Sequence, residues 1–286
     1  MNPPALVITA LEKRYPRFAL GPIHLTVPSG VIYGLIGPNG AGKTTLLDQI
    51  FGIGMPDAGS IQVSGRDHRQ DEVAIKQRTA YAGPDLSYVS WGKVGRAVRF
   101  VRGFHPDWDD GLATRLMQSF GLSEGDRIAT LSFGGRMKLA LLLAMAWRPQ
   151  FLVLDEPTTG LDAHAKKSLF SELLAIVRDE ARTVLLSSHQ ITDLERFADH
   201  VSVLHQGRLL LEGPTAELVE RHVQVEFEGR LPVPIPGLTI FAQEGSQCRA
   251  VVDTQALPLT QLVSHGAHNL HSQALTLEEL FLALTS

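Results

Sequence analysis

The residues best suited to chemistry form a glycine-rich segment that fits the phosphate-binding pattern G-x-x-x-x-G-K-[ST]: Gly37, Pro38, Asn39, Gly40, Ala41, Gly42, Lys43 and Thr44. An apolar run at 31–36 predicts a strand before the segment, and the run at 44–51 predicts a helix after it. Glycines let successive backbone N–H groups converge on phosphate oxygens, and the helix amino terminus adds about half a positive charge. We therefore predict that Lys43 neutralises the β- and γ-phosphates, that the Thr44 hydroxyl ligates Mg²⁺ and that Thr45 adds a phosphate contact. A structural turn with an incidental lysine is the alternative interpretation.

Two acidic residues, Asp155 and Glu156, directly follow the apolar run Phe151–Leu154. Parallel α/β sheets bind ligands at the carboxyl ends of their strands, so we expect both carboxylates to face the phosphate loop. Asp155 is suited to hold Mg²⁺ directly or through water, and Glu156 to orient and deprotonate an attacking water. A helix cap after a buried strand is the structural alternative for either carboxylate alone.

A third segment, Leu131-Ser132-Phe133-Gly134-Gly135, precedes a long helical pattern. In an arbitrary protein it would be a helix cap with Ser132 as N-cap. Its order and spacing, after the phosphate loop and shortly before Asp155, resemble the signature sequence of ATP-binding cassette (ABC) proteins. The resemblance implies that Ser132, Phe133, Gly134 and Gly135 form a second anion site, which grips the γ-phosphate of ATP on an opposing subunit. It implies ATP and Mg²⁺ as cofactors, bound at a dimer interface.

Further positions match the same family. Gly160-Leu161-Asp162 resembles its D-loop, which implies that Asp162 lies at the interface with the partner subunit. His189, after the strand pattern at 183–187, matches the switch histidine, which contacts the γ-phosphate and helps to position water. Tyr15 matches the aromatic residue that stacks on adenine, with Phe18 as the competing ring. Packing against a sheet is the structural alternative for either ring.

One segment departs from the family pattern. The family usually carries a glutamine after the strand that corresponds to 79–83, where it ligates Mg²⁺ and relays the nucleotide state to the helical insertion. Here residues 81–86 read Tyr-Ala-Gly-Pro-Asp-Leu, so we predict Asp85 as the replacement metal ligand. Pro84 occupies or adjoins the usual position, which leaves both metal ligation and coupling geometry open.

Alternating strand and helix patterns at 31–51, 151–178 and 183–197 predict an α/β protein whose phosphate-loop NTPase core has a mostly parallel sheet. Short strand patterns at 5–10, 24–27 and 60–63 predict an antiparallel β subdomain beside it. Periodicity over 92–147 predicts a helical insertion, which we place at about 85–147. We expect the cassette domain at 1–222 and a small C-terminal α+β accessory domain at 223–286, with strands at 223–227, 238–242 and 249–252 and a closing helix at 277–284.

Composition limits the partners and the compartment. The net charge of -4 supplies no global positive field, so no nucleic acid partner is expected. The single cysteine, Cys248, favours a reducing compartment. The longest apolar stretch, 139–147, is far shorter than the roughly 20 residues that span a bilayer. We expect a cytoplasmic protein, peripheral on the inner face of the cell membrane through a partner.

The motifs cover residues 1 to about 222, and the tail at 275–281 resembles the closing segment of single-cassette ATPase subunits of bacterial exporters. That resemblance implies an ATP-hydrolysing subunit that pairs with a second cassette subunit, as a homodimer or heterodimer, and powers a separately encoded multispanning transmembrane permease. Two other interpretations stay open: a soluble ABC ATPase without a transport role, and a regulatory partner in a heterodimer.

Overall fold

The computed structural model describes residues 3–83, 89–180, 182–229, 231 and 234–285. The chain divides into two compact units. The first comprises Met1–His189 with Leu204–Leu209, and the second comprises Gln190–Val203 with Leu210–Ser286.

A six-stranded sheet with the order β10-β9-β3-β8-β7-β6 carries the functional residues. Its strands are β3 (Ile32–Ile36), β6 (Thr79–Ala82), β7 (Phe151–Leu154), β8 (Thr183–Ser188), β9 (His200–His205) and β10 (Arg208–Pro214). The pairs β3/β8, β8/β7 and β7/β6 are parallel, and every residue of β3, β7 and β8 is buried. Continuous apolar runs are typical of such interior strands. The predicted mostly parallel core is confirmed.

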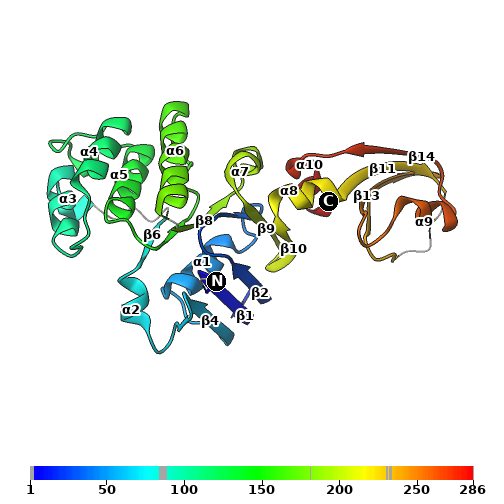
Figure 1. Cartoon of the computed structure of the whole chain (residues 1–286), viewed down its shortest axis with the longest axis horizontal. Helices are drawn as coiled ribbons and strands as arrows, with labels where there is room; N and C mark the ends of the chain where they lie inside the picture. The colour runs from blue at the N-terminus through cyan, green and yellow to red at the C-terminus, as the bar shows by residue number, and fades with distance from the viewer. Residues whose placement is uncertain (1–2, 84–88, 181, 230, 232–233, 286) are drawn as a thin grey trace. The chain divides into compact units, whose positions relative to one another are not determined.

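Helices cover this sheet and form the predicted insertion (Figure 1). They are α1 (Lys43–Phe51), α2 (Glu72–Lys76), α3 (Val94–Arg102), α4 (Asp110–Ser119), α5 (Phe133–Met145) and α6 (Ala163–Glu180), with 3-10 turns η1 (Val89–Trp91) and η2 (Ile128–Thr130). Helix α5 contacts α3, α4 and β6, and its apolar run at 139–145 is buried throughout. The same run therefore anchors the insertion to the sheet.

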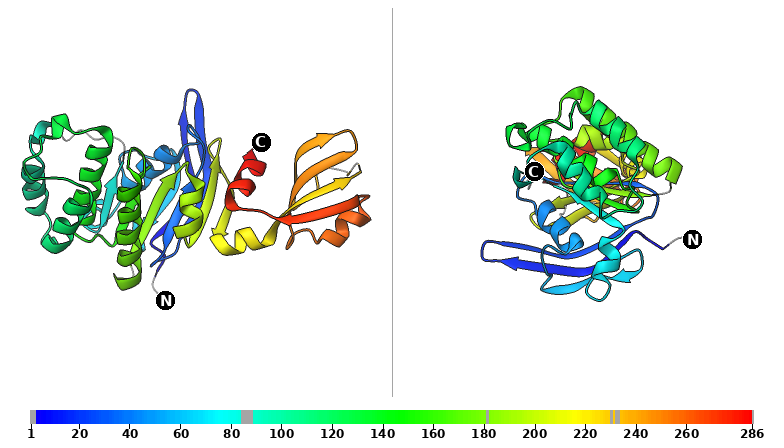
Figure 2. Two further views of the ribbon diagram at one scale, coloured as in Figure 1. Left: turned by 90° about the horizontal axis from the view of Figure 1, so that it is seen from above. Right: turned by 90° about the vertical axis from the view of Figure 1, so that its left-hand side faces the viewer.

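An antiparallel sheet of order β2-β1-β4-β5 lies in the first unit (Figure 2). Its strands are β1 (Leu6–Tyr15), β2 (Phe18–Val27), β4 (Ala58–Val63) and β5 (Arg66–Asp67). The predicted strands at 5–10 and 24–27 are both shorter than β1 and β2. Register shifts between Ile8 and Leu11 break the alternation in β1, and Gly21 and Pro22 interrupt it in β2. The buried face packs with Leu46, Leu47 and Ile50 of α1 in one hydrophobic cluster.

In the second unit, an antiparallel sheet of order β12-β13-β11-β14 has its own hydrophobic cluster. The strands of this sheet are β11 (His222–Glu228), β12 (Leu238–Glu244), β13 (Gln247–Asp253) and β14 (His268–Ala274). The helices of the unit are α7 (Ile191–Phe197), α8 (Thr215–Arg221), α9 (Leu259–Ser264) and α10 (Leu277–Thr285). Strand β14 was not predicted, because most of its residues are exposed and it lacks apolar alternation. No helix among the described residues has both the length and the apolar character to cross a membrane.

Candidate functional site

The phosphate loop turns sharply between β3 and α1. A Cβ atom on Gly37 would lie 2.4 Å from the Leu204 carbonyl oxygen, so the backbone there leaves no room for a side chain. Gly42 caps α1 at φ 106°, a left-handed conformation that favours glycine, and its Cβ would lie 2.6 Å from a ring carbon of Phe18. Gly37 is therefore required by the close approach of another backbone segment, and Gly42 by its left-handed backbone conformation. The loop leads directly into the amino terminus of α1 at Lys43.

The ammonium group of Lys43 lies between the loop and the end of β7. Its Nζ donates to the carbonyl oxygens of Gly37 at 2.6 Å and Pro38 at 3.3 Å. It also forms an ion pair with Glu156, with 3.1 Å between Nζ and Oε1. Lys43 is only 6% exposed, so this charge is available at one buried position beside the loop. A buried cation beside a loop that leads into a helix amino terminus is suited to neutralise phosphate oxygens.

Oxygen atoms suited to a hard cation lie next to Lys43. The Thr44 hydroxyl donates to Oδ2 of Asp155 at 2.6 Å, and Asp155 is fully buried. A hydroxyl and a carboxylate oxygen at this separation are the kinds of ligand that Mg²⁺ prefers, so the residues fit a magnesium site. The negative charge extends to α1, where burial and, secondly, the charge of Asp155 raise the pKa of Asp48.

Ser187 of β8 ties the two acidic residues together. Its Oγ donates to Oδ1 of Asp155 and accepts from the backbone N–H of Glu156 at 2.9 Å. The sequence interpretation missed this residue. A signal existed, because β8 ends beside β7 in a parallel sheet and the polar pair Ser187-Ser188 interrupts an apolar strand there.

The Glu156 carboxylate bridges the phosphate loop and the predicted switch histidine. Its Oε2 lies 2.7 Å from Nδ1 of His189 and accepts from the His189 backbone N–H at 3.4 Å. Glu156 adopts φ 50°, which is uncommon for a residue with a side chain. Lys43, Thr44, Asp155, Glu156 and His189 are thus linked in one network, which Ser187 completes.

The signature segment begins helix α5 and meets the predicted D-loop. Ser132 is the N-cap, and its Oγ accepts from the Gly135 N–H at 3.1 Å. A Cβ on Gly134 would lie 2.0 Å from the carbonyl oxygen of Gly160. Phe133, which belongs to the predicted signature segment, is 39% exposed.

Asp162 accepts from Lys138 Nζ at 2.8 Å and from the Ala165 N–H at 2.9 Å. The hydrogen bond from Lys138, followed by that from Ala165, lowers the pKa of Asp162 to about 2. The D-loop carboxylate is therefore tied to the helix that the signature begins.

The two candidate adenine rings lie at the end of the β1–β2 hairpin, where Tyr15 pairs with Phe18 in register. Tyr15 is 47% exposed and carries the Lys13 ammonium 5.8 Å from its ring centroid. Phe18 packs against the hydrophobic cluster and against Gly42. Exposure leaves the Tyr15 ring available for stacking, whereas Phe18 supports the loop. The predicted metal ligand Asp85 lies outside the described residues.

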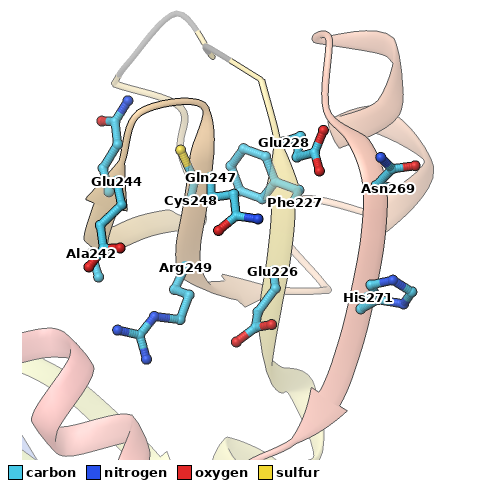
Figure 3. Close-up of a pocket in the computed structure, with 11 residues that line it drawn as sticks. Glu226, Phe227, Glu228, Ala242, Glu244, Gln247, Cys248, Arg249, Asn269 and His271 are labelled. Carbon is cyan, nitrogen blue, oxygen red and sulfur yellow. The ribbon is translucent and has the colours of Figure 1, made fainter.

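A separate cavity of about 530 Å³ lies in the second unit (Figure 3). Glu226 faces Arg249 across β11 and β13, and it faces His271 across β11 and β14. The cavity lining contains both acidic and basic side chains, and none of the predicted site residues belongs to it. This cavity is therefore distinct from the network around Lys43.

Comparisons with known proteins give the family to which the chain is similar. Residues 20–159 match the family model "ABC transporter". The chain is 33% identical over 206 residues to the daunorubicin/doxorubicin resistance ATP-binding protein DrrA of Streptomyces peucetius, covering 70% of this chain and 62% of that protein. It is 31% identical to the Nod factor export ATP-binding protein I of Burkholderia orbicola, over 96% of this chain and 95% of that protein.

Among solved structures, an ATP-binding subunit of an ABC transporter superposes with a TM-score of 0.65 at 24% identity, over 76% of this chain and 92% of that one. This likeness establishes the fold. Together with the long alignment to the export protein, it shows that the chain belongs to the ABC transporter family and is one of its ATP-binding subunits, an ATPase.

Proposed function

We propose that the network around Lys43 binds MgATP and hydrolyses it, and that the Glu156 carboxylate is the base that accepts a proton from the attacking water. The observation that carries this proposal is the bridge that Glu156 makes between Lys43 at 3.1 Å and His189 at 2.7 Å. A carboxylate held between a phosphate-binding cation and a second polar contact is suited to orient a water for in-line attack.

The other groups divide the remaining work. Lys43 and the loop N–H groups neutralise charge on the β- and γ-phosphates, with Thr45 adding a contact, and His189 contacts the γ-phosphate. Tyr15 stacks on adenine, which tolerates any purine. Thr44 and Asp155 would hold Mg²⁺, with Asp85 as a further oxygen ligand. When bound, this ion would neutralise charge on the phosphate oxygens.

We propose that the second half of each site comes from another cassette subunit. Ser132, Gly134 and Gly135 begin a helix whose N–H groups suit a phosphate, with Phe133 beside them. Their close neighbour in this chain is the D-loop, since Gly134 packs against Gly160. Closure of two subunits on two ATP molecules would bring each signature to the partner's γ-phosphate, in a homodimer or a heterodimer.

The transport role we propose is export, powered through a separately encoded transmembrane permease at the inner face of the membrane. It is supported by relatives whose names describe drug resistance and Nod factor export. The division of labour agrees with the absence of a membrane-spanning helix among the described residues. We propose residues 223–286 as the accessory domain of this subunit.

Glu156→Gln tests the catalytic assignment because it keeps the size of the side chain and removes the base. We expect the hydrolysis rate of the purified chain to fall at least about 100-fold, within the range for loss of a general base, while ATP binding persists. Lys43→Ala, as a comparison, should lose both binding and hydrolysis. A Glu156→Gln protein that hydrolyses ATP at the normal rate would refute the role of Glu156.

A further inference from the structure

A cavity of about 770 Å³ lies in the first unit, at the amino-terminal ends of three neighbouring strands. Arg78 directly precedes β6, Gln150 precedes β7 and Arg182 precedes β8, and all three line the cavity. The Gln150 N–H donates to the Arg78 carbonyl oxygen at 2.9 Å, which fixes two of these residues side by side. Glu156 follows the opposite end of β7, so the cavity and the ATP site lie at opposite edges of the sheet.

Cationic side chains outnumber acidic ones in the cavity lining, in a chain of net charge -4. Four cations line it, against one acidic residue: Lys76, Arg78, Arg148, Arg182 and Asp107. Asp109 pairs with Arg148 at 2.6 Å, and Glu72 pairs with Lys76 at 2.6 Å. The exposed Arg78 guanidinium forms no ion pair with any residue that the structure describes.

The surroundings of Arg182 disfavour its charged form. Burial and, secondly, the charge of Arg148 lower the pKa of the Arg182 guanidinium, and Asp107 opposes them. An oxyanion in the cavity would relieve this repulsion and pair with Arg78. Guanidinium groups suit such a ligand, because their planar donors match phosphate oxygens in bidentate geometry.

Apolar side chains project beside these cations. Val73 and Phe104 line the same cavity, and they are 72% and 69% exposed. The Phe104 ring also contacts that of Phe100, which is 54% exposed, with 5.1 Å between centroids. A soluble anion would use only the cations. Cations mixed with exposed apolar side chains are typical of surfaces that lie in the headgroup layer of an anionic membrane.

We propose that this cavity, with its exposed neighbours Val73 and Phe104, binds the phosphate headgroups of an anionic bilayer. Arg78 and Arg182 pair with headgroup phosphates, and Phe104 reaches the boundary with the acyl chains. This contact goes beyond the proposed ATP-driven transport, because it attaches the chain to lipid directly and not only through a transmembrane partner.

Co-sedimentation of the full chain with vesicles tests the proposal, using phosphatidylcholine with or without phosphatidylglycerol. We expect binding that requires phosphatidylglycerol and weakens at high salt. Each cation near an anionic bilayer contributes about fivefold to partitioning, so Arg78→Gln with Arg182→Gln should weaken binding roughly 25-fold. The matched control is Arg14→Gln with Arg208→Gln, which removes the same charge from exposed positions outside the cavity and should bind normally.

Further variants distinguish the sources of the anion. Phe104→Ser should weaken vesicle binding and leave a titration with inorganic phosphate unchanged, and the single exposed change Arg78→Gln should weaken vesicle binding about fivefold. ATPase activity should persist in every variant, which reports folding. The proposal is overturned if the control loses as much binding as the cavity variant, or if phosphatidylglycerol makes no difference. Arginine-dependent binding of inorganic phosphate or of a polyglutamate peptide, without vesicle binding, would assign the cavity to a soluble phosphate or to an acidic protein segment instead.

Discussion

One buried hydroxyl group, Oγ of Ser187, holds the two acidic residues that follow β7. Ser187→Ala removes its hydrogen bonds to the Asp155 carboxylate, which is fully buried, and to the Glu156 N–H, which is partly buried. A buried polar group without a partner costs about 1–3 kcal/mol, and a charged one lies at the upper end. We therefore expect the free energy of unfolding to fall by about 3 kcal/mol.

The same substitution should slow hydrolysis. Glu156 keeps an uncommon backbone conformation at φ 50°, and the bond from its N–H to Ser187 helps to maintain it. Without this bond the carboxylate can shift relative to Lys43 and His189. Since a displacement of about 1 Å can cost about 100-fold in rate, we expect kcat to fall by up to that factor. KM for ATP should change little, because the phosphate loop is untouched.

Urea unfolding and steady-state ATPase assays of Ser187→Ala and Ser202→Ala check both effects. Ser202 is also fully buried, but its hydroxyl has no hydrogen-bond partner among the described residues. Ser202→Ala should therefore leave stability nearly unchanged. If Ser187→Ala costs no more than Ser202→Ala, the hydroxyl does not organise the site. A loss of stability with unchanged kcat would refute its effect on Glu156.

Three further predictions concern the signature, the D-loop and the adenine contact. Gly134→Ala places Cβ 2.0 Å from the Gly160 carbonyl oxygen, and we expect this overpacking to cost about 1–3 kcal/mol in urea unfolding. The hydrogen bond from Lys138 is the largest cause that lowers the pKa of Asp162 to about 2. Its contribution to the free energy of unfolding is therefore fully present above the unfolded-state pKa of about 3.9, and it is lost as the pH falls through about 2. Asp162→Asn should remove that acid-side loss from a stability profile against pH. Tyr15→Ala should weaken ATP binding about tenfold in a fluorescence titration, because stacking on a base contributes roughly 1–3 kcal/mol.

Each of these predictions has its own control. Gly135→Ala should cost clearly less than Gly134→Ala, because its Cβ would lie 3.3 Å from the Leu131 side chain and not 2.0 Å from backbone, and because alanine favours a helix. Equal costs at Gly134 and Gly135 would contradict the packing argument. An unchanged acid limb in Asp162→Asn would show that this carboxylate is not stabilised in the folded state. Unaltered ATP binding in Tyr15→Ala would move the adenine assignment to Phe18.

The core of the site could be predicted because it depends on chain order. A strand, a glycine-rich turn and a helix place Lys43 and Thr44 at one sheet edge, and parallel pairing brings the end of β7 to the same edge. The strand at 151–154 matches the structure for a similar reason, since a continuous apolar run marks it. Local patterns and a parallel topology were sufficient here.

What the sequence did not predict depends on neighbours that are distant in the chain. The polar pair Ser187-Ser188 interrupts an apolar strand, but the partner of Ser187, Asp155, becomes evident only when β7 lies beside β8. Strand β14 is held by pairing with β11 and carries mostly exposed side chains, so it lacks apolar alternation. The far end of β1 was missed because register shifts after Ile8 change which side chains face the core.

The parallel sheet separates two kinds of chemistry along the same strands. Asp155 and Glu156 follow the end of β7, Ser187 lies in the last part of β8, and the same two strands begin after Gln150 and Arg182. Because every residue of both strands is buried, the two edges are connected through a close-packed core. Lipid bound at the amino-terminal edge would change the ATPase rate only if this core had two arrangements with different affinity for lipid. If the sheet is rigid, bound lipid cannot change the ATPase rate. The ATPase rate of the isolated chain should therefore be the same with and without phosphatidylglycerol vesicles. A change in kcat would show that the sheet transmits the effect of lipid binding to the ATP site.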